Sequence, residues 1–171
     1  MGTGTVNLSL MGGGGGPAND ECAGATLVTC GSSTTQDNTA ATTAVTDPVY
    51  SCRFGSPGQG FHTLWYKFVA AGPNVSLSTD NSVVTDTMLA LYDGSCGALV
   101  ELACNDDISG ANLQSAIVFN GLTPGNTYYV QLAGFGAGNA GSVTLDIECV
   151  VGPQDGDACE DAIEIACDDQ A

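Results

Sequence analysis

The sequence of 171 residues is poor in basic residues, with 2 Lys+Arg against 19 Asp+Glu and a formal net charge of −17. A chain with so little positive charge cannot neutralise phosphate groups, which excludes nucleic acid as a partner. The same shortage excludes binding to anionic membrane surfaces. No run approaches the ~20 consecutive apolar residues of a membrane helix, so we expect no membrane insertion.

Charge of either sign is scarce, at 12% of the residues, whereas 43% are hydrophobic and 24 are glycine. This hydrophobic fraction argues against global disorder, and the lack of Lys-, Glu- and Leu-rich periodic runs argues against a helical protein. The length suits one ordinary domain with short extensions.

The eight cysteines form an even set that contains no Cys-x-x-Cys pair, and the sequence has one histidine. This combination favours disulfides over a zinc site. Disulfides persist in oxidising compartments, so we expect a secreted protein that is extracellular or lies at the cell surface.

The body of the chain shows the alternation of β-strands. Val143, Leu145 and Ile147 share one face of the clearest strand, while 87–92 is apolar on both faces, as expected of a central strand. The Thr-rich stretch 32–46 is interpreted as a solvated strand and loop, or as a carrier of O-linked sugar. Apolar patterns predict strands over 63–69, 75–77, 87–92, 117–119, 128–132 and 142–148. Short strands separated by Gly, Pro and Asn predict an all-β fold, an antiparallel β-sandwich without helices.

Three segments follow from the composition. Residues 1–16 hold one alternating strand, in which Val6, Leu8 and Leu10 share a face, and a tether of five glycines. The sandwich domain is predicted over 17–152. The segment 153–171 contains seven of the acidic residues.

An internal repeat links this last segment to the start of the body. Asp20–Cys30 matches Asp157–Cys167 at an offset of 137 residues, with the same Cys spacing and an Ala three residues after the first Cys. The C-terminal segment therefore resembles the first strand of a second repeat, with Ile163 and Ile165 as its apolar positions. Chance similarity in a Cys- and Ala-rich chain is the alternative.

Six sequence blocks give the body a family resemblance. They are Asn19–Cys22, Leu64–Phe68, Asp86–Asp93, Ser95–Gly97, Cys104–Asp107 and Gly125–Val130. In this order and spacing they resemble the bacterial pre-peptidase C-terminal (PPC) domain. The resemblance implies a jelly-roll-like extracellular sandwich that serves as an accessory module, appended to secreted enzymes or repeated on surface proteins.

The spacing of the cysteines suggests their pairing. Three pairs are eight residues apart, which suits a bridge across a turn, and the two remaining cysteines would then pair with each other. These pairs are Cys22–Cys30, Cys96–Cys104 and Cys159–Cys167, with Cys52–Cys149 left over. Other pairings stay open, because six cysteines in the body allow fifteen connectivities.

An acidic turn is the candidate metal site. Asn105, Asp106 and Asp107, together with Asp86 or Asp93 from the neighbouring strand, offer the oxygen ligands that Ca²⁺ prefers. The PPC resemblance adds that relatives hold calcium in acidic loops. The alternative is that the aspartates cap a turn through hydrogen bonds to the backbone. No other cofactor is expected.

Nothing in the sequence indicates catalysis. His62 is the only histidine and no nucleophile motif surrounds it, so we interpret it as a loop residue and expect no enzyme, although a triad of scattered residues stays open. Trp65 lies in mid-strand, which favours a core position over a platform for sugar binding.

The terminal segments suggest self-assembly. An extended strand carrying Val6, Leu8 and Leu10 can add to the sheet edge of another copy, and the strand carrying Ile163 and Ile165 can do the same. Head-to-tail contacts of this kind give a filament. The leading hypothesis is therefore a structural subunit of an extracellular homopolymeric filament, and the alternative is a non-catalytic binding or spacer module for calcium or a glycan.

Overall fold

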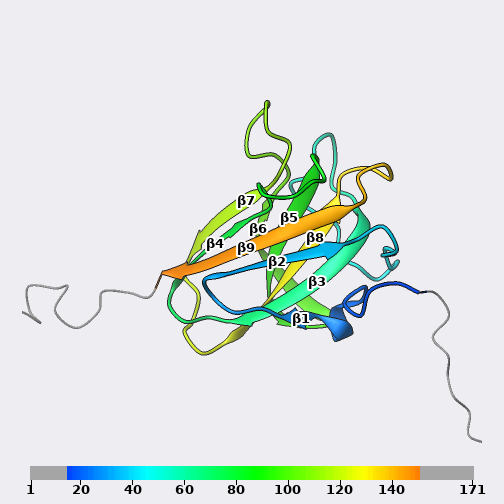
Figure 1. Ribbon diagram of the computed structural model, residues 1–171. Coiled ribbons are helices and arrows are strands. Elements are labelled where there is room, and N and C mark those ends of the chain that lie inside the picture. Colours follow the sequence, from blue (N-terminus) through cyan, green and yellow to red (C-terminus); the bar gives the residue numbers. More distant parts are fainter. Residues whose placement is uncertain (1–14, 151–171) are drawn as a thin grey trace, which may run out of the picture.

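A computed structural model describes residues 15–150, which form two sheets packed face to face (Figure 1). The described part contains one 3₁₀ turn and nine strands. These are η1 (Cys22–Gly24), β1 (Thr26–Leu27), β2 (Ser32–Asp37), β3 (Phe61–Val69), β4 (Asn74–Ser78), β5 (Thr87–Ser95), β6 (Ala98–Asn105), β7 (Ala116–Asn120), β8 (Thr127–Gly134) and β9 (Ser142–Val150). None of these residues belongs to a helix with the length and hydropathy needed to cross a membrane.

The two sheets have the orders β1-β3-β8-β5-β6 and β2-β9-β4-β7. All neighbouring strands are antiparallel except β1, which runs parallel to β3. The prediction of an all-β antiparallel sandwich is therefore confirmed. The bounds of the three predicted segments stay a prediction, because residues 1–14 and 151–171 lie outside the described residues.

Within residues 15–150, the strands predicted from apolar patterns are all present, and each extends a little beyond its pattern. The strands predicted around Val6–Leu10 and Ile163–Ile165 lie outside the described residues. Strand β1 lies within Asp20–Cys30, where the internal repeat placed the first strand of the body, and the structure adds β6, which the sequence patterns did not indicate. Strand β2 consists of Ser, Thr, Gln and Asp, and lies at the edge of its sheet with alternate residues exposed, in agreement with a solvated strand. An edge position allows such a polar strand because pairing with β9 alone supplies its hydrogen bonds.

The alternation along the strands of the larger sheet fills two cores. The first lies between the sheets and includes Leu89 and Leu91 of β5. The second covers the outer face of the five-stranded sheet and includes Met88, Ala90 and Tyr92 of the same strand. Both faces of this sheet are therefore buried, which explains why β5 is apolar on both sides.

The second core contains Trp65, the largest of the fully buried side chains. Trp65 and Tyr50 are fully buried in it, and the Trp65 ring centroid lies 5.9 Å from that of Tyr92. The expectation that Trp65 is a core residue is confirmed. Residues near η1 and in the loop between β2 and β3 complete this core, and the bridges Cys22–Cys96 and Cys52–Cys104 hold these two segments in place.

The disulfide pairing differs from the prediction. The structure joins cysteines that are 74, 119 and 52 residues apart. The bridges are Cys22–Cys96, Cys30–Cys149 and Cys52–Cys104. The predicted pairs Cys22–Cys30, Cys96–Cys104 and Cys52–Cys149 are therefore wrong, and the predicted pair Cys159–Cys167 lies outside the described residues.

Strand pairing supplies the reason. The register of β2 against β9 sets Ser32 opposite Ile147, and the same register sets Cys30 opposite Cys149. In the chain-entropy model, closing loops of this length stabilises the fold by about 4 to 5 kcal/mol per bridge, more than short loops achieve. The bridges therefore join distant parts of the sandwich instead of closing single turns.

Candidate functional site

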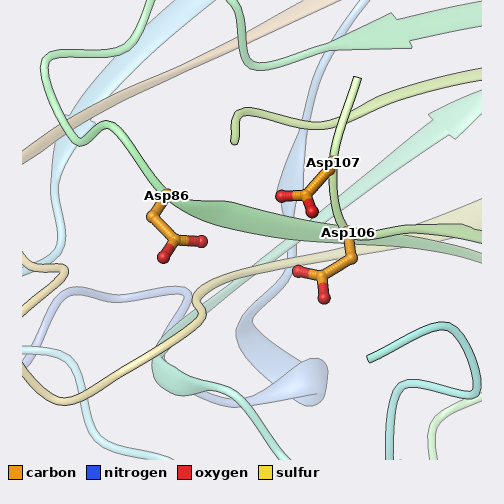
Figure 2. Close-up of side chains that lie close together, drawn as sticks. All are labelled: Asp86, Asp106 and Asp107. Carbon is orange, nitrogen blue, oxygen red and sulfur yellow. The ribbon is translucent and has the colours of Figure 1, made fainter. Parts of the chain in front are cut away.

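The β5–β6 hairpin brings three carboxylates together. Asp86 directly precedes β5, and Asp106 and Asp107 directly follow β6. The antiparallel register pairs Leu89 with Asn105, so the start of β5 lies beside the end of β6. One carboxylate oxygen from each aspartate lies within 4.8 Å of the other two (Figure 2).

A network of polar side chains fixes the turn that carries these aspartates. Asn105 donates from Nδ2 to the carbonyl of Asp107 at 3.1 Å, and its Oδ1 accepts from the Ala116 backbone N–H at 2.9 Å. The Ser115 hydroxyl lies 2.9 Å from the Asp106 carbonyl. The backbone here is therefore held by β7 and cannot relax freely away from the three charges.

Asp106 is the most buried member of the cluster, with 6% of its surface exposed. Its Oδ2 accepts a hydrogen bond from the Phe54 N–H at 2.7 Å, whereas its buried Oδ1 has no partner. Burial raises the pKa of Asp106, and the charge of Asp107 adds to this effect, while the Phe54 N–H and Arg53 oppose it. Burial likewise raises the pKa of Asp86, with the charges of Asp106 and Asp107 as further causes.

A pocket of about 370 Å³ opens beside the cluster. Its apolar wall consists of Phe54, Phe135 and Leu113, and the three aspartates form its polar side. Phe54 is 78% exposed although it belongs to a loop tied down by the Cys52–Cys104 bridge. The pocket therefore combines an exposed aromatic ring with hydrogen-bond acceptors.

Arg53 is the basic residue next to this pocket. Its guanidinium carbon lies 4.5 Å from the centroid of the Phe135 ring, and the group donates to the Phe135 carbonyl at 3.4 Å. Arg53 therefore orients one wall of the pocket through a cation–π contact.

The structure separates the predicted metal ligands into two groups. Asp86, Asp106 and Asp107 are brought together, whereas the other two residues of the predicted set are not. Asp93 lies seven residues further along β5, roughly 20 Å away for an extended strand. Both polar side-chain atoms of Asn105 are used in fixing the turn.

A second, larger pocket of about 470 Å³ lies on the outer face of the five-stranded sheet, beside the Cys22–Cys96 bridge. Its buried carboxylate, Asp47, accepts from the Trp65 indole N–H at 3.2 Å and from the Ala44 N–H at 3.0 Å. Because both oxygens have partners, this pocket offers no free buried ligand atom.

His62 lies in β3 at an irregularity of the strand, not in the loop that the sequence suggested. Its Nδ1 is 3.1 Å from the carbonyl oxygen of Ala41, and its Nε2 is 3.3 Å from that of Ala137. Within residues 15–150, its ring hydrogen bonds are to these backbone carbonyls, which is not the arrangement of a general base and its nucleophile.

Sequence patterns did not indicate Phe54 and Phe135 as site residues. A signal for Phe54 existed, because it directly precedes the run Gly55-Ser56-Pro57-Gly58, which is typical of a loop. An aromatic residue at such a position is unsuited to a core strand. Phe135 directly follows β8 and carried no such signal. The strand-exchange candidates Val6, Leu8, Leu10, Ile163 and Ile165 lie outside the described residues.

Comparison with known proteins identifies the domain. A family model described as galactose-binding-domain-like and associated with T9SS matches residues 18–147. The chain belongs to this galactose-binding-domain-like family. The match covers the described sandwich up to Ile147 in β9, including the three aspartates and both pockets.

Two solved structures match the chain at low sequence identity. One is the pre-peptidase C-terminal domain of a collagenase from Bacillus anthracis, with 16% identity, a TM-score of 0.45, and coverage of 72% of this chain and 94% of that chain. Another is CorA, a surface-associated copper-binding protein of Methylomicrobium album BG8, with 10% identity, a TM-score of 0.42, and coverage of 74% and 100%. A search of curated protein sequences gives no significant match.

The family match and the two-sheet fold confirm the prediction of a PPC-like secreted β-sandwich domain. Membership of the galactose-binding-domain-like family places the chain among non-catalytic surface and binding modules. The association of the family with T9SS and the three disulfides indicate an extracellular or surface location.

Proposed function

We propose that this galactose-binding-domain-like module binds a glycan in the pocket formed by Phe54, Phe135 and the three aspartates. The observation that carries the proposal is the 78% exposed ring of Phe54 beside a group of carboxylates. A sugar presents an apolar face that packs on an aromatic ring, and hydroxyls that donate to carboxylate oxygens. The description of the family supports a saccharide as the ligand class.

The size and position of the pocket support this proposal. A volume of about 370 Å³ suits one or two sugar rings. The Cys52–Cys104 bridge and the bond from the Phe54 N–H to Asp106 hold the aromatic loop in place, so little ordering is needed when a ligand binds.

Titration calorimetry with galactose and a panel of other mono- and disaccharides tests the proposal. We expect saturable binding of at least one sugar, and about a tenfold loss of affinity in Phe54→Ala, which removes the stacking surface. Val118→Ala, which alters an equally exposed apolar residue on β7, should bind as the unmodified chain does. The proposal fails if no sugar in the panel binds, or if Phe54→Ala binds as well as Val118→Ala.

A second candidate function is a subunit of a filament assembled by strand exchange. Strand β7 forms an outer edge of the four-stranded sheet and contains no charged residue or proline, while Val118 on it is 75% exposed. Such an edge lacks the usual protection against pairing with another strand. In this hypothesis the partners are other copies of the chain, which donate a terminal strand.

Sedimentation of the purified chain distinguishes this candidate. We expect assemblies that pellet for the full chain and a soluble monomer after deletion of residues 1–11. A monomeric full chain, or pelleting that the deletion leaves unchanged, would contradict strand exchange.

A further inference from the structure

We propose that Asp86, Asp106 and Asp107 form a binding site for a divalent cation, and that this cation is calcium. The inference concerns the same three aspartates as the proposed sugar site, but it does not require that a sugar binds there. Three carboxylate oxygens within 4.8 Å of one another are close enough to share one ion. Figure 2 shows the three side chains turned toward a common space between β5 and the end of β6.

The strongest observation is the unpartnered oxygen of Asp106. This residue is more than nine-tenths buried, and its Oδ1 has no hydrogen-bond partner. An ionised carboxylate oxygen in such a position loses its hydration without compensation, which is unfavourable unless a cation or donor contacts it. In Figure 2 one oxygen of Asp106 points toward Asp86 and Asp107, the direction in which a shared ion would lie.

One basic side chain, Arg53, offsets part of the negative charge of the three carboxylates. The whole chain has two basic side chains, Arg53 and Lys67. The guanidinium of Arg53 lies over the Phe135 ring and donates to a backbone carbonyl. Lys67 is in β3, at the register position opposite Tyr129 of β8. Three carboxylates held together by a fixed turn therefore repel one another, and a bound cation would turn this repulsion into attraction.

The donor set favours calcium over transition metals. The cluster contains carboxylates alone, without histidine or cysteine, which are the donors that zinc and copper prefer. Calcium accepts six to eight oxygen ligands in flexible geometry, so water from the open pocket can complete its coordination. Magnesium requires a stricter octahedron, which three side chains from two strand ends are less suited to provide.

Calorimetric titration of the full chain with calcium chloride, without any sugar, tests the inference. We expect one binding site per chain with a Kd on the order of 10⁻⁴ M, as in extracellular calcium modules. Calcium at about 10 mM should then raise the Tm by roughly 5 °C. Asp106→Asn keeps an oxygen to accept from the Phe54 N–H but lacks the charge, and should abolish both effects.

Two further variants make the result decisive. Asp86→Asn should also abolish the binding heat and the Tm shift. Because the Asp86 side chain is less buried, this variant tests the site even if Asp106→Asn fails to fold. Asp93→Asn removes one carboxylate charge from β5, outside the cluster, and should bind calcium as the unmodified chain does. Absence of binding in the unmodified chain, an equal response to magnesium, or an unchanged response in both ligand variants would overturn the proposal.

Discussion

Two buried aspartates lie beside the two pockets of this domain, and they differ in how many hydrogen bonds they accept. Asp47 is 7% exposed, and both of its oxygens accept hydrogen bonds, one from the buried indole N–H of Trp65 and one from the half-buried N–H of Ala44. Asp106 is 6% exposed, but it accepts one hydrogen bond from Phe54 and its second oxygen has no partner.

The comparison shows that burial of an acid does not by itself mark a functional site. Burial raises the pKa of Asp47 and of Asp106 alike. The number of protein partners distinguishes them, because Asp47 is fully used by the fold whereas Asp106 retains an oxygen for something else. We therefore interpret Asp47 as a structural residue and Asp106 as a ligand-binding residue.

Replacement of each aspartate by alanine gives the largest expected effect. Asp47→Ala leaves the buried Trp65 N–H and the half-buried Ala44 N–H without an acceptor and should lower the free energy of unfolding by about 2 to 4 kcal/mol. Without calcium, Asp106→Ala loses one hydrogen bond but also removes a buried charge, so we expect a change within about 1 kcal/mol. Urea unfolding of both variants in a chelating buffer measures the difference.

Addition of calcium should reduce the difference in stability between Asp47→Ala and Asp106→Ala. The cation stabilises the unmodified chain and Asp47→Ala, but not Asp106→Ala, so the loss in Asp106→Ala should grow with calcium concentration. If calcium leaves this loss unchanged, or if Asp106→Ala is the more damaging substitution in chelator, the distinction between the two aspartates is wrong.

Proteolysis offers a more local test of the Asp106 site. Trypsin can cut this chain after Arg53, in the loop held by Asp106, and after Lys67 in β3. A cation bound to Asp106 should reduce opening of the loop, so we expect calcium to slow cleavage after Arg53 by about tenfold. Mass spectrometry of the reduced fragments measures the initial rate at each position.

The control for this assay separates the loop from trypsin itself. Cleavage of an unstructured peptide in the same tube corrects for the effect of calcium on the protease. Asp106→Asn should lose the protection after Arg53, whereas Asp93→Asn should keep it. Equal protection in both variants would show that the cation acts elsewhere.

Much of the fold was predictable because it depends on short-range alternation. The strand Val143, Leu145, Ile147 directs its apolar side chains into the core between the sheets, and the pattern alone gave this face. Strand β6 was missed because its residues are mostly half-buried and do not alternate in hydropathy. Its position follows from pairing with β5, which is a long-range interaction.

The prediction of the disulfide pairing was wrong for the same reason. A separation of eight residues favours local pairing, but Cys30 lies opposite Cys149 because of the register between β2 and β9. Since Cys22 and Cys30 do not pair with each other, the matching spacing of Cys159 and Cys167 no longer supports a bridge between those two residues.

The candidate site was predictable in part. The run Asp106-Asp107 after an apolar stretch identified an acidic turn, and Asp86 followed from its position at a strand end. The choice between Asp86 and Asp93 required the hairpin register, which sets the start of β5 beside the end of β6. The unpartnered oxygen of Asp106 depends on three-dimensional packing and has no signature in the sequence.

The smallest expected effect is a pH dependence of stability through Asp47. Burial raises the pKa of this carboxyl in the folded state, the charges of Glu21 and Asp20 add to the rise, and the bonds from Ala44 and Trp65 oppose it. The folded state therefore binds the proton more tightly than the unfolded state, whose pKa stays near 3.8. Stability from this group should rise as the pH falls through the raised pKa and level off below the unfolded value.

Asp47→Asn isolates this contribution because asparagine does not titrate and keeps an oxygen for the Trp65 N–H. We expect the unfolding free energy of the unmodified chain, measured relative to Asp47→Asn in urea titrations, to increase as the pH is lowered from 7 to 4. Exposed Asp37 has a lowered pKa from its bonds to Thr39, so its contribution has the opposite sign, but it is the same in both proteins and cancels in the difference. A difference that falls on acidification would mean that the bonds to Trp65 and Ala44 outweigh burial, and Asp47 would then be held as a stable anion in its pocket.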